Sequence, residues 1–455
     1  MTTSVKDGAW TVGAAPGALP VLGHSRQLRS DPLGFLASLH QHGDIVAIRM
    51  GPTPLNVLCR HDLAHHLLVE RSKDFGRGGP FLERSRTIMG NGLATSTGPE
   101  HMRQRRMSQP AFHSQHIKSY MRVMQEEATA MAAAWQPGEE VDIVQAVHDL
   151  TTRVTLRCFF TMRTDGSGNS DTVNQAADSL DRLTAGMYQQ MTAPLAVMSK
   201  LPTAANKRYR EAVRQFDETV DKIIADQRRT ETRDDLLGLL MSAQDEDTGT
   251  TFDDAELHDQ VITFLAAGID TTANTLAWAL GLIAHDPEVQ QRFQSEIDTQ
   301  LGGQDVSYEN IRSLTYTDAI LDETLRLYPP LWMLTRRALR DTTLGSHHFP
   351  SGTQFAVSPY ALQRDPRVFD EPDHFDPERR KRQPDIPRSS FIPFGAGVHK
   401  CIGDAFAITE STIALATIGQ HWNLRLSPES TPLKPQTEMT MGPASVLVTL
   451  EPREV

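Results

Sequence analysis

A ten-residue segment around one cysteine restricts the fold of this chain more than any other feature. It reads FGAGVHKCIG and runs from Phe394 to Gly403. Gly395 and Gly397 allow a tight turn, because glycine adopts backbone conformations that other residues avoid. A helix that begins just after Cys401 would direct its first amides toward the sulfur and favour the thiolate. The segment therefore predicts a metal-binding thiolate at the start of a helix.

Composition excludes several other classes of protein. Three cysteines in 455 residues (Cys59, Cys158 and Cys401) are too few for a disulfide scaffold or a four-thiolate metal site. The net charge of −12 argues against nucleic acid as a partner. The N-terminus shows no signal-peptide pattern, and no run reaches the roughly 18 apolar residues that span a bilayer. We therefore expect a cytoplasmic protein without a membrane anchor.

The residue pattern is mainly helical, with a small sheet. Helix-forming residues dominate from about 100 to 330, and a last helix is expected around 404–420. Short strands are expected at 45–50, 55–58, 336–338 and 354–357. Because the strands near 45 and 355 should share one sheet, we predict one intertwined domain over residues 1–455. The predicted fold class is mainly α with a small β subdomain.

The cysteine segment resembles the ligand loop of the cytochrome P-450 haem-thiolate monooxygenases. That loop has the pattern Phe-Gly-x-Gly-x-(Arg or His)-x-Cys-x-Gly. The resemblance implies the P-450 fold, with a long central helix over a haem b, and it makes Cys401 the iron ligand, with Phe394 and His399 beside the cofactor. It also implies a monooxygenase that activates dioxygen. Three further segments follow in the family's order, so the resemblance spans nearly the whole chain.

The first of these segments is AGIDTT (267–272), inside a helix predicted from about His258 to His285. A glycine in mid-helix costs about 1 kcal/mol relative to alanine, and a groove for dioxygen would explain Gly268. Asp270 and Thr271 are about 100° apart on a helix. The resemblance implies a relay, with the Thr271 hydroxyl toward dioxygen and Asp270 toward the proton supply. The alternative is an ordinary buried helix whose threonines bond to its own carbonyls.

The second segment places Glu323 and Arg326 three residues apart, on one helix face. Such a pair on a surface contributes little to stability. The resemblance implies instead a buried pair, closed by the arginine of a Phe-x-Pro-x-Arg segment, here Arg379. The role of the three residues would be structural.

The third segment contains His101 and Arg105, which are four residues apart and share a helix face. Haem carries two propionates, which need cationic donors where they are buried. The resemblance assigns this role to His101 and Arg105, together with Arg336 and His399. A solvated helix face is the alternative interpretation.

Electrons must come from outside, because no segment has the pattern of a flavin or iron–sulfur module. The resemblance implies NAD(P)H as their source, with a ferredoxin reductase and a ferredoxin as partners of a monomeric enzyme. A basic patch for an acidic ferredoxin could be formed by Arg105, Arg106, Arg379, Arg380, Lys381, Arg382 and Lys400.

The expected pocket residues are apolar, aromatic or thioether side chains, which favour an uncharged lipophilic substrate. Short stretches such as 186–188 and 358–360 are similar to those of bacterial enzymes that oxidise sesquiterpenes, which predicts a terpenoid of secondary metabolism. A fatty acid anchored by Arg84 or Arg86, or a macrocycle, stays open. The pocket residues we expect are Phe81, Leu93, Met187, Met191, Phe264, Ala267, Trp332 and Leu334.

Two rival functions remain at this point. A haem-thiolate enzyme can use peroxide or rearrange its substrate without dioxygen, but the pair Asp270-Thr271 argues against this. A catalytically silent haem-binding or gas-sensing module is the rival from another class. No regulatory or DNA-binding segment in the sequence supports it.

Overall fold

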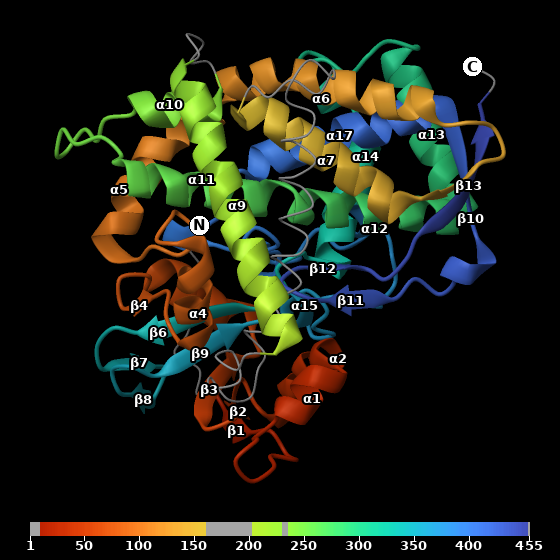
Figure 1. Cartoon of the computed structure of the whole chain (residues 1–455). Helices are drawn as coiled ribbons and strands as arrows, with labels where there is room; N and C mark the ends of the chain where they lie inside the picture. Colours follow the sequence, from red (N-terminus) through yellow and green to blue (C-terminus); the bar gives the residue numbers. More distant parts are fainter. Residues whose placement is uncertain (1–9, 161–202, 230–234, 454–455) are drawn as a thin grey trace.

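A computed structural model of the chain describes residues 10–160, 203–229 and 235–453. Helices form most of it, and a mixed sheet lies at one end (Figure 1). The longer helices are α4 (Pro80–Met89), α5 (Gly98–Ser108), α6 (Ser114–Ala134), α7 (Ile143–Phe160), α9 (Ala204–Arg229), α11 (Asp254–Gly268), α12 (Asp270–His285), α13 (Pro287–Leu301), α14 (Thr315–Leu327) and α17 (Asp404–His421). The shorter ones are α1 (Ser25–Ser30), α2 (Pro32–Ser38), α3 (His61–His65), η2 (His66–Glu70), α10 (Leu236–Ser242), α15 (Pro359–Leu362), α16 (Arg379–Arg382) and η7 (Gly397–His399).

The main sheet combines N-terminal strands with strands from residues 334–357, as the sequence predicts. Its strands, in spatial order, are β1 (Val12–Ala14), β2 (Ile45–Met50), β3 (Thr53–Leu58), β9 (Gln354–Val357), β6 (Leu334–Ala338) and β4 (Phe75–Gly76). Strand β3 pairs in parallel with β9, so that Val57 lies opposite Ala356. The predicted sharing of one sheet is confirmed.

Three smaller sheets complete the β structure of the described residues. They are β10 (Trp422–Leu426) with β13 (Leu447–Pro452) and β5 (Glu140–Asp142), β11 (Pro435–Thr437) with β12 (Met441–Pro443), and β7 (Thr342–Leu344) with β8 (His347–Phe349).

The central helix is not continuous, which corrects the prediction of one helix from His258 to His285. Helices α11 and α12 follow one another across the molecule (Figure 1) and meet at Ile269, where φ is −82° and ψ is −73°. The Thr271 hydroxyl donates a hydrogen bond to the carbonyl of Ala267 at 2.6 Å. A bond from threonine to the carbonyl four residues earlier bends a helix, which accounts for the break.

Helix α12 lies in the core, where it packs against α7, α14 and α17. Its residues Leu276 to Leu280 are fully buried. Burying one leucine side chain contributes about 1.5–3 kcal/mol to the stability of the fold. The burial of Leu276 and Leu280 therefore holds the helix firmly in place. Within the described residues, no helix combines the length and the apolar character needed to cross a membrane.

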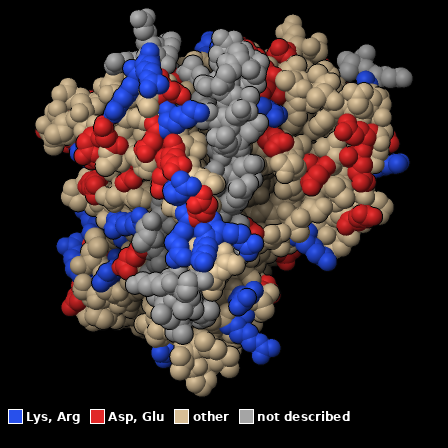
Figure 2. Space-filling view, in the orientation of Figure 1, with Lys and Arg blue, Asp and Glu red and all other residues tan. Residues whose placement is uncertain are grey.

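The surface carries charges of both signs despite the net charge of −12. Figure 2 shows Lys and Arg gathered over the first turns of α9, where Lys207, Arg208 and Arg210 are exposed, while Asp and Glu occur between the basic groups elsewhere on this face. The net negative charge is therefore not spread evenly over the surface.

Candidate active site

The cysteine loop has the tight geometry that its glycines predict. The φ angles of Gly395 and Gly397 are +68° and +70°. A Cβ on Gly397 would lie 1.9 Å from the carbonyl oxygen of Leu68, so only glycine lets the loop approach η2 this closely. The Cys401 amide donates to the carbonyl of Phe394 at 2.9 Å, which closes the loop just before α17 begins.

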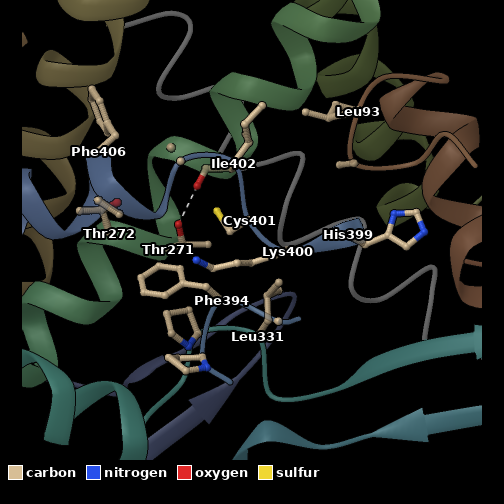
Figure 3. A pocket seen from close by; sticks show the side chains of 18 of the residues that line it. Leu93, Thr271, Thr272, Leu331, Phe394, His399, Lys400, Cys401, Ile402 and Phe406 are labelled. Carbon is tan, nitrogen blue, oxygen red and sulfur yellow. Dashed lines mark hydrogen bonds between the residues drawn. The ribbon is translucent and has the colours of Figure 1, made fainter. Parts of the chain in front are cut away.

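Cys401 and residues on both sides of the break between α11 and α12 line the same cavity. Figure 3 shows Cys401, Thr271 and Phe394 directed into the same space, with Leu331 at one side and His399 at the edge. Gly268 also lines this cavity. Because the Thr271 hydroxyl hydrogen is engaged by Ala267, the oxygen presents its lone pairs as acceptors.

Burial raises the pKa of the Cys401 thiol, whereas the Gly403 backbone amide lowers it. Burial is the larger of the two effects, so the helix start alone does not make a thiolate here. The amide lowers the pKa, as the sequence analysis expects, but it is outweighed because loss of hydration disfavours the charged form of the sulfur. A positive metal ion is the partner that would stabilise the thiolate.

The cavity wall is largely apolar and combines predicted with unpredicted residues. Leu93, Phe264, Ala267 and Leu334 line it, in agreement with the sequence analysis. No periodic pattern in the sequence identifies the other apolar members, which come from separate helices and loops. These members are Phe112, Phe159, Pro330, Leu331, Pro393, Ile402 and Phe406.

Trp332 is the pocket prediction that the structure contradicts. Its indole nitrogen donates to the carbonyl of Glu438 at 3.2 Å, and its ring is buried in a core cluster beside Met441. The indole N–H finds its partner outside the cavity, which turns the ring away from it. Met187 and Met191 lie outside the described residues, and only the backbone of Phe81, in α4, is described.

One edge of the cavity gathers cationic side chains. Arg336 is buried, and burial lowers the pKa of its guanidinium to about 10. Burial and the nearby guanidinium groups lower the pKa of His399 to about 2, and its Nδ1 has no hydrogen-bond partner among the described residues. The rings of His101 and His399 lie 4.2 Å apart. Arg105 lines the same edge and donates to the carbonyl of Lys400 at 2.6 Å.

Arg77 is a further cation at this edge, which the sequence analysis missed. It donates to the carbonyls of Leu93 and Ala94 at 2.7 and 2.9 Å. Burial, reinforced by Arg336 and Arg105, lowers the pKa of Arg77 to about 9. Its sequence context, FGRGGP, contains no spacing that could have identified it. Buried cations that repel one another indicate a site for an anion.

Glu323, Arg326 and Arg379 meet in the protein interior beneath this site. Arg326 binds both carboxylate oxygens of Glu323 at 2.8 Å, and Arg379 Nε lies 2.9 Å from Oε1. The three residues are 3 to 5% exposed. Both guanidinium groups also donate to the carbonyl of His374, which ties α14 to the segment before the cysteine loop.

Comparison with known protein families shows which family has this cavity and cysteine loop. The family model "Cytochrome P450" matches residues 14–452. The chain belongs to the cytochrome P450 family. This P450 is a monooxygenase that binds haem, uses dioxygen and receives electrons from redox partners.

Three relatives from Streptomyces are similar to this P450 over almost its whole length. Cyclooctatin synthase of Streptomyces melanosporofaciens is 40% identical over 98% of this chain and 96% of its own. Cyclooctat-9-en-7-ol 5-monooxygenase of the same organism is 41% identical over 93% of this chain and 91% of its own. Pentalenene oxygenase of Streptomyces avermitilis is 39% identical over 92% and 93% of the two chains.

The residues of this P450 fit haem. The buried guanidinium groups of Arg77 and Arg336 at one edge, together with the unpaired Nδ1 of His399, match the need of two propionates for donors. The Cys401 sulfur faces the cavity as an iron ligand must. His101 has a backbone carbonyl near each ring nitrogen, Leu93 at 3.2 Å and Val398 at 3.3 Å. A neutral imidazole can donate to only one of them, so its part in propionate binding stays a prediction.

Asp270 and Thr271 of the P450 face different sides of α12. Thr271 lines the cavity, whereas an Asp270 carboxylate oxygen lies 3.3 Å from Nε2 of His148 on α7. The sequence analysis did not identify His148, because it lies 122 positions before its partner on another helix.

The basic patch predicted for this P450 differs in the structure, because one of its residues is buried and most of the others are paired with carboxylates. Arg379 is buried against Glu323 and cannot contribute to a surface. Carboxylates pair with the other cations that could form the patch, except for Arg105. The pairs are Arg106 with Asp245 and Asp247, Arg380 with Asp322, Lys381 with Glu378, Arg382 with Asp376, and Lys400 with Asp404.

Proposed function

We propose that this P450 hydroxylates, or further oxidises, an uncharged terpenoid in bacterial secondary metabolism. The observation that carries the proposal is the apolar lining of the cavity that Cys401 faces. Leu93, Phe264, Ala267, Leu331 and Leu334 contribute to it, and none of the described residues that line the cavity is acidic. The names of the Streptomyces relatives, with pentalenene and cyclooctat-9-en-7-ol as the compounds acted on, support the same substrate class.

The cationic edge of the cavity does not argue for an anionic substrate. The guanidinium groups of Arg77 and Arg336 would bind the haem propionates and so be neutralised, and the His399 ring would contribute a hydrogen bond there. Arg86, which the sequence analysis considered as an anchor for a fatty acid, donates to the carbonyl of Thr95 at 2.9 Å and lies near the Thr97 hydroxyl. A guanidinium that already donates to the loop after its helix is a poor anchor for a carboxylate, which argues against a fatty acid held by Arg86. The side chain of Arg84, the other candidate anchor, lies outside the described residues.

The chain's own residues divide the work of the reaction. Haem, when bound, supplies the activation of dioxygen. Cys401 would hold the iron, and the cationic edge would fix the orientation of the ring. The apolar wall would position the substrate and exclude water. The Thr271 hydroxyl oxygen would accept a hydrogen bond within the cavity, while Asp270, which faces His148, would receive protons from that side of α12.

The experiment is a pair of spectra followed by product analysis. The reduced enzyme with carbon monoxide should show a strongly red-shifted Soret band, and Cys401→Ser should lose it. Pentalenene, as a probe, should displace the haem water in a spectral titration and yield a product one oxygen heavier. A long-chain fatty acid and a macrolactone are the comparison ligands. Preferential binding and oxidation of either comparison ligand would contradict the terpenoid proposal.

We further propose that the electrons come from NAD(P)H through a ferredoxin reductase and a ferredoxin, and that the enzyme is a monomer. The paired charges around the cysteine loop make a weak, salt-sensitive contact the expected mode of docking. Turnover should therefore fall steeply between low and physiological ionic strength. Turnover with a flavodoxin but with no ferredoxin, or a dimer in light scattering, would contradict these proposals.

A further inference from the structure

A buried polar contact joins α7 to the start of α12. Nε2 of His148 lies 3.3 Å from a carboxylate oxygen of Asp270, and the two side chains are 17% and 16% exposed. Asp270 directly precedes Thr271, which lines the cavity. The His148–Asp270 pair is therefore partly accessible to solvent and is one residue away from the cavity wall.

The same face of α7 carries two buried threonines whose hydroxyls lack hydrogen-bond partners among the described residues. Thr152 and Thr155 follow His148 by four and seven residues, which places all three on one helix face. They are 3% and 0% exposed, and neither hydroxyl has a hydrogen-bond partner among the described residues. A buried hydroxyl without a partner costs about 1–3 kcal/mol. Ordered water usually supplies the missing bonds at such positions.

Gly268 connects this row of polar groups to the cavity. A Cβ on Gly268 would lie 3.1 Å from the Thr155 hydroxyl oxygen and 3.4 Å from the ring of Phe159. Gly268 also lines the cavity and directly precedes the helix break at Ile269. The missing side chain thus leaves α7 and α11 close together, with the Thr155 hydroxyl beside the backbone of the cavity wall.

We propose that His148, Thr152 and Thr155, with water held between α7 and the helices α11 and α12, form the proton path to Asp270 and the cavity. His148 is the proton-carrying residue at the outer end of this path, in contact with Asp270. The inference rests on the monooxygenase reaction, in which a substrate RH, dioxygen, two electrons and two protons give ROH and water. The redox partners supply the electrons, and the path supplies the two protons.

The test uses the complete haem enzyme with three variants and a matched control. His148→Gln, Thr152→Val and Thr155→Val keep side-chain size but remove a proton-carrying group. Thr151→Val is the control, since the buried Thr151 hydroxyl already donates within α7 to the carbonyl of His148 at 3.1 Å. A red-shifted carbon monoxide spectrum in each variant would show that it has folded and holds haem.

Each variant is driven in two ways, with NADPH plus a surrogate ferredoxin system and with hydrogen peroxide, using pentalenene as the substrate probe. Peroxide and RH give ROH and water without external protons, so this reaction bypasses the path. We expect NADPH-driven product formation to fall about tenfold in His148→Gln and Thr155→Val, with an increased solvent deuterium effect. Peroxide-driven product formation should stay at the wild-type level, and Thr151→Val should match the wild type in both modes.

A second readout does not depend on turnover. A high-resolution crystal structure of the haem enzyme should show ordered water bonded to the hydroxyls of Thr152 and Thr155, and Thr155→Val should lose the water at that position. His148→Gln combined with Asp270→Asn should be no worse than Asp270→Asn alone, because both residues belong to one path.

The outcomes separate this inference from the proposed function. Equal ratios of NADPH-driven to peroxide-driven product in the wild type, His148→Gln and Thr155→Val would overturn the path, as would a dry contact at Thr155. A wild-type enzyme that oxidises no terpenoid with either oxidant would instead contradict the proposed substrate class. The crystal structure would then still decide whether the path holds water.

Discussion

Arg379 Nε lies 2.9 Å from a carboxylate oxygen of Glu323, although the two residues are 56 positions apart in the chain. Both side chains are almost fully buried. The carboxylate is shared with Arg326, so one negative charge serves two guanidinium groups. Such an arrangement holds only while every member is present, because a buried charge without its partner is costly.

Arg379→Gln should therefore destabilise the enzyme by about 3–5 kcal/mol. The variant leaves Glu323 with one cation and removes the hydrogen bonds that Arg379 donates to three backbone carbonyls. Urea unfolding of the haem enzyme measures the effect. Arg382→Gln is the control, since this neighbour pairs with Asp376 at the surface with 58% of its side chain exposed, and its loss should cost at most about 1 kcal/mol. Equal losses in the two variants would contradict the structural role of Arg379.

Arg77→Gln should weaken haem binding, because the variant removes a buried cation beside the predicted propionates. A charged hydrogen bond contributes about 1.5–3 kcal/mol, so haem should dissociate about 10- to 100-fold faster. Transfer of haem to excess apomyoglobin measures the rate. Arg340→Gln, which affects an exposed arginine paired with Asp74, should leave the rate unchanged. An unchanged rate in Arg77→Gln would show that Arg77 only orders its own loop.

Leu334→Ala should affect substrate binding and Trp332→Phe should affect stability, although the two residues are only two positions apart. Leu334 lines the cavity, so its truncation should weaken terpenoid binding by about 1.5–3 kcal/mol and cost little stability. Trp332→Phe loses the bond to Glu438, which should lower the free energy of unfolding by about 1–3 kcal/mol and leave binding intact. Spectral titration and urea unfolding measure the two quantities. Weakened binding in Trp332→Phe would return that residue to the pocket.

Asp318→Asn should stabilise the enzyme, and the gain should depend on pH. Partial burial, with Asp322 and Glu296 nearby, raises the pKa of Asp318 to about 6. The folded chain then binds this proton more tightly than the unfolded chain, whose aspartates have a pKa of about 3.9. Wild-type stability should therefore fall as the pH rises through this interval, and Asp318→Asn should escape that loss.

Thermal unfolding of Asp318→Asn and the wild type between about pH 4 and pH 8 measures this prediction. The difference in midpoint should grow up to about pH 6 and then stay constant. The exposed Asp385, changed to asparagine, is the control and should show no such trend. A difference that is already full at the acidic end would contradict the assignment.

The sequence alone determined the features that depend on a single turn or helix face. The cysteine loop needs left-handed glycines at 395 and 397, and the structure has them. The strands at 45–50 and 354–357 were readable because their residues are β-branched and apolar within short, bounded runs. Glu323 and Arg326 share a helix face because residues three positions apart in a helix are neighbours.

Only the tertiary structure decided which residues from distant segments meet. It brought Arg77 to the cationic edge, turned Trp332 toward Glu438, broke the central helix at Ile269 and paired Asp270 with His148. The physical reason is that periodicity determines the direction of a side chain relative to its own element. What that side chain contacts depends on how the elements pack, and on where each buried polar group finds its partner.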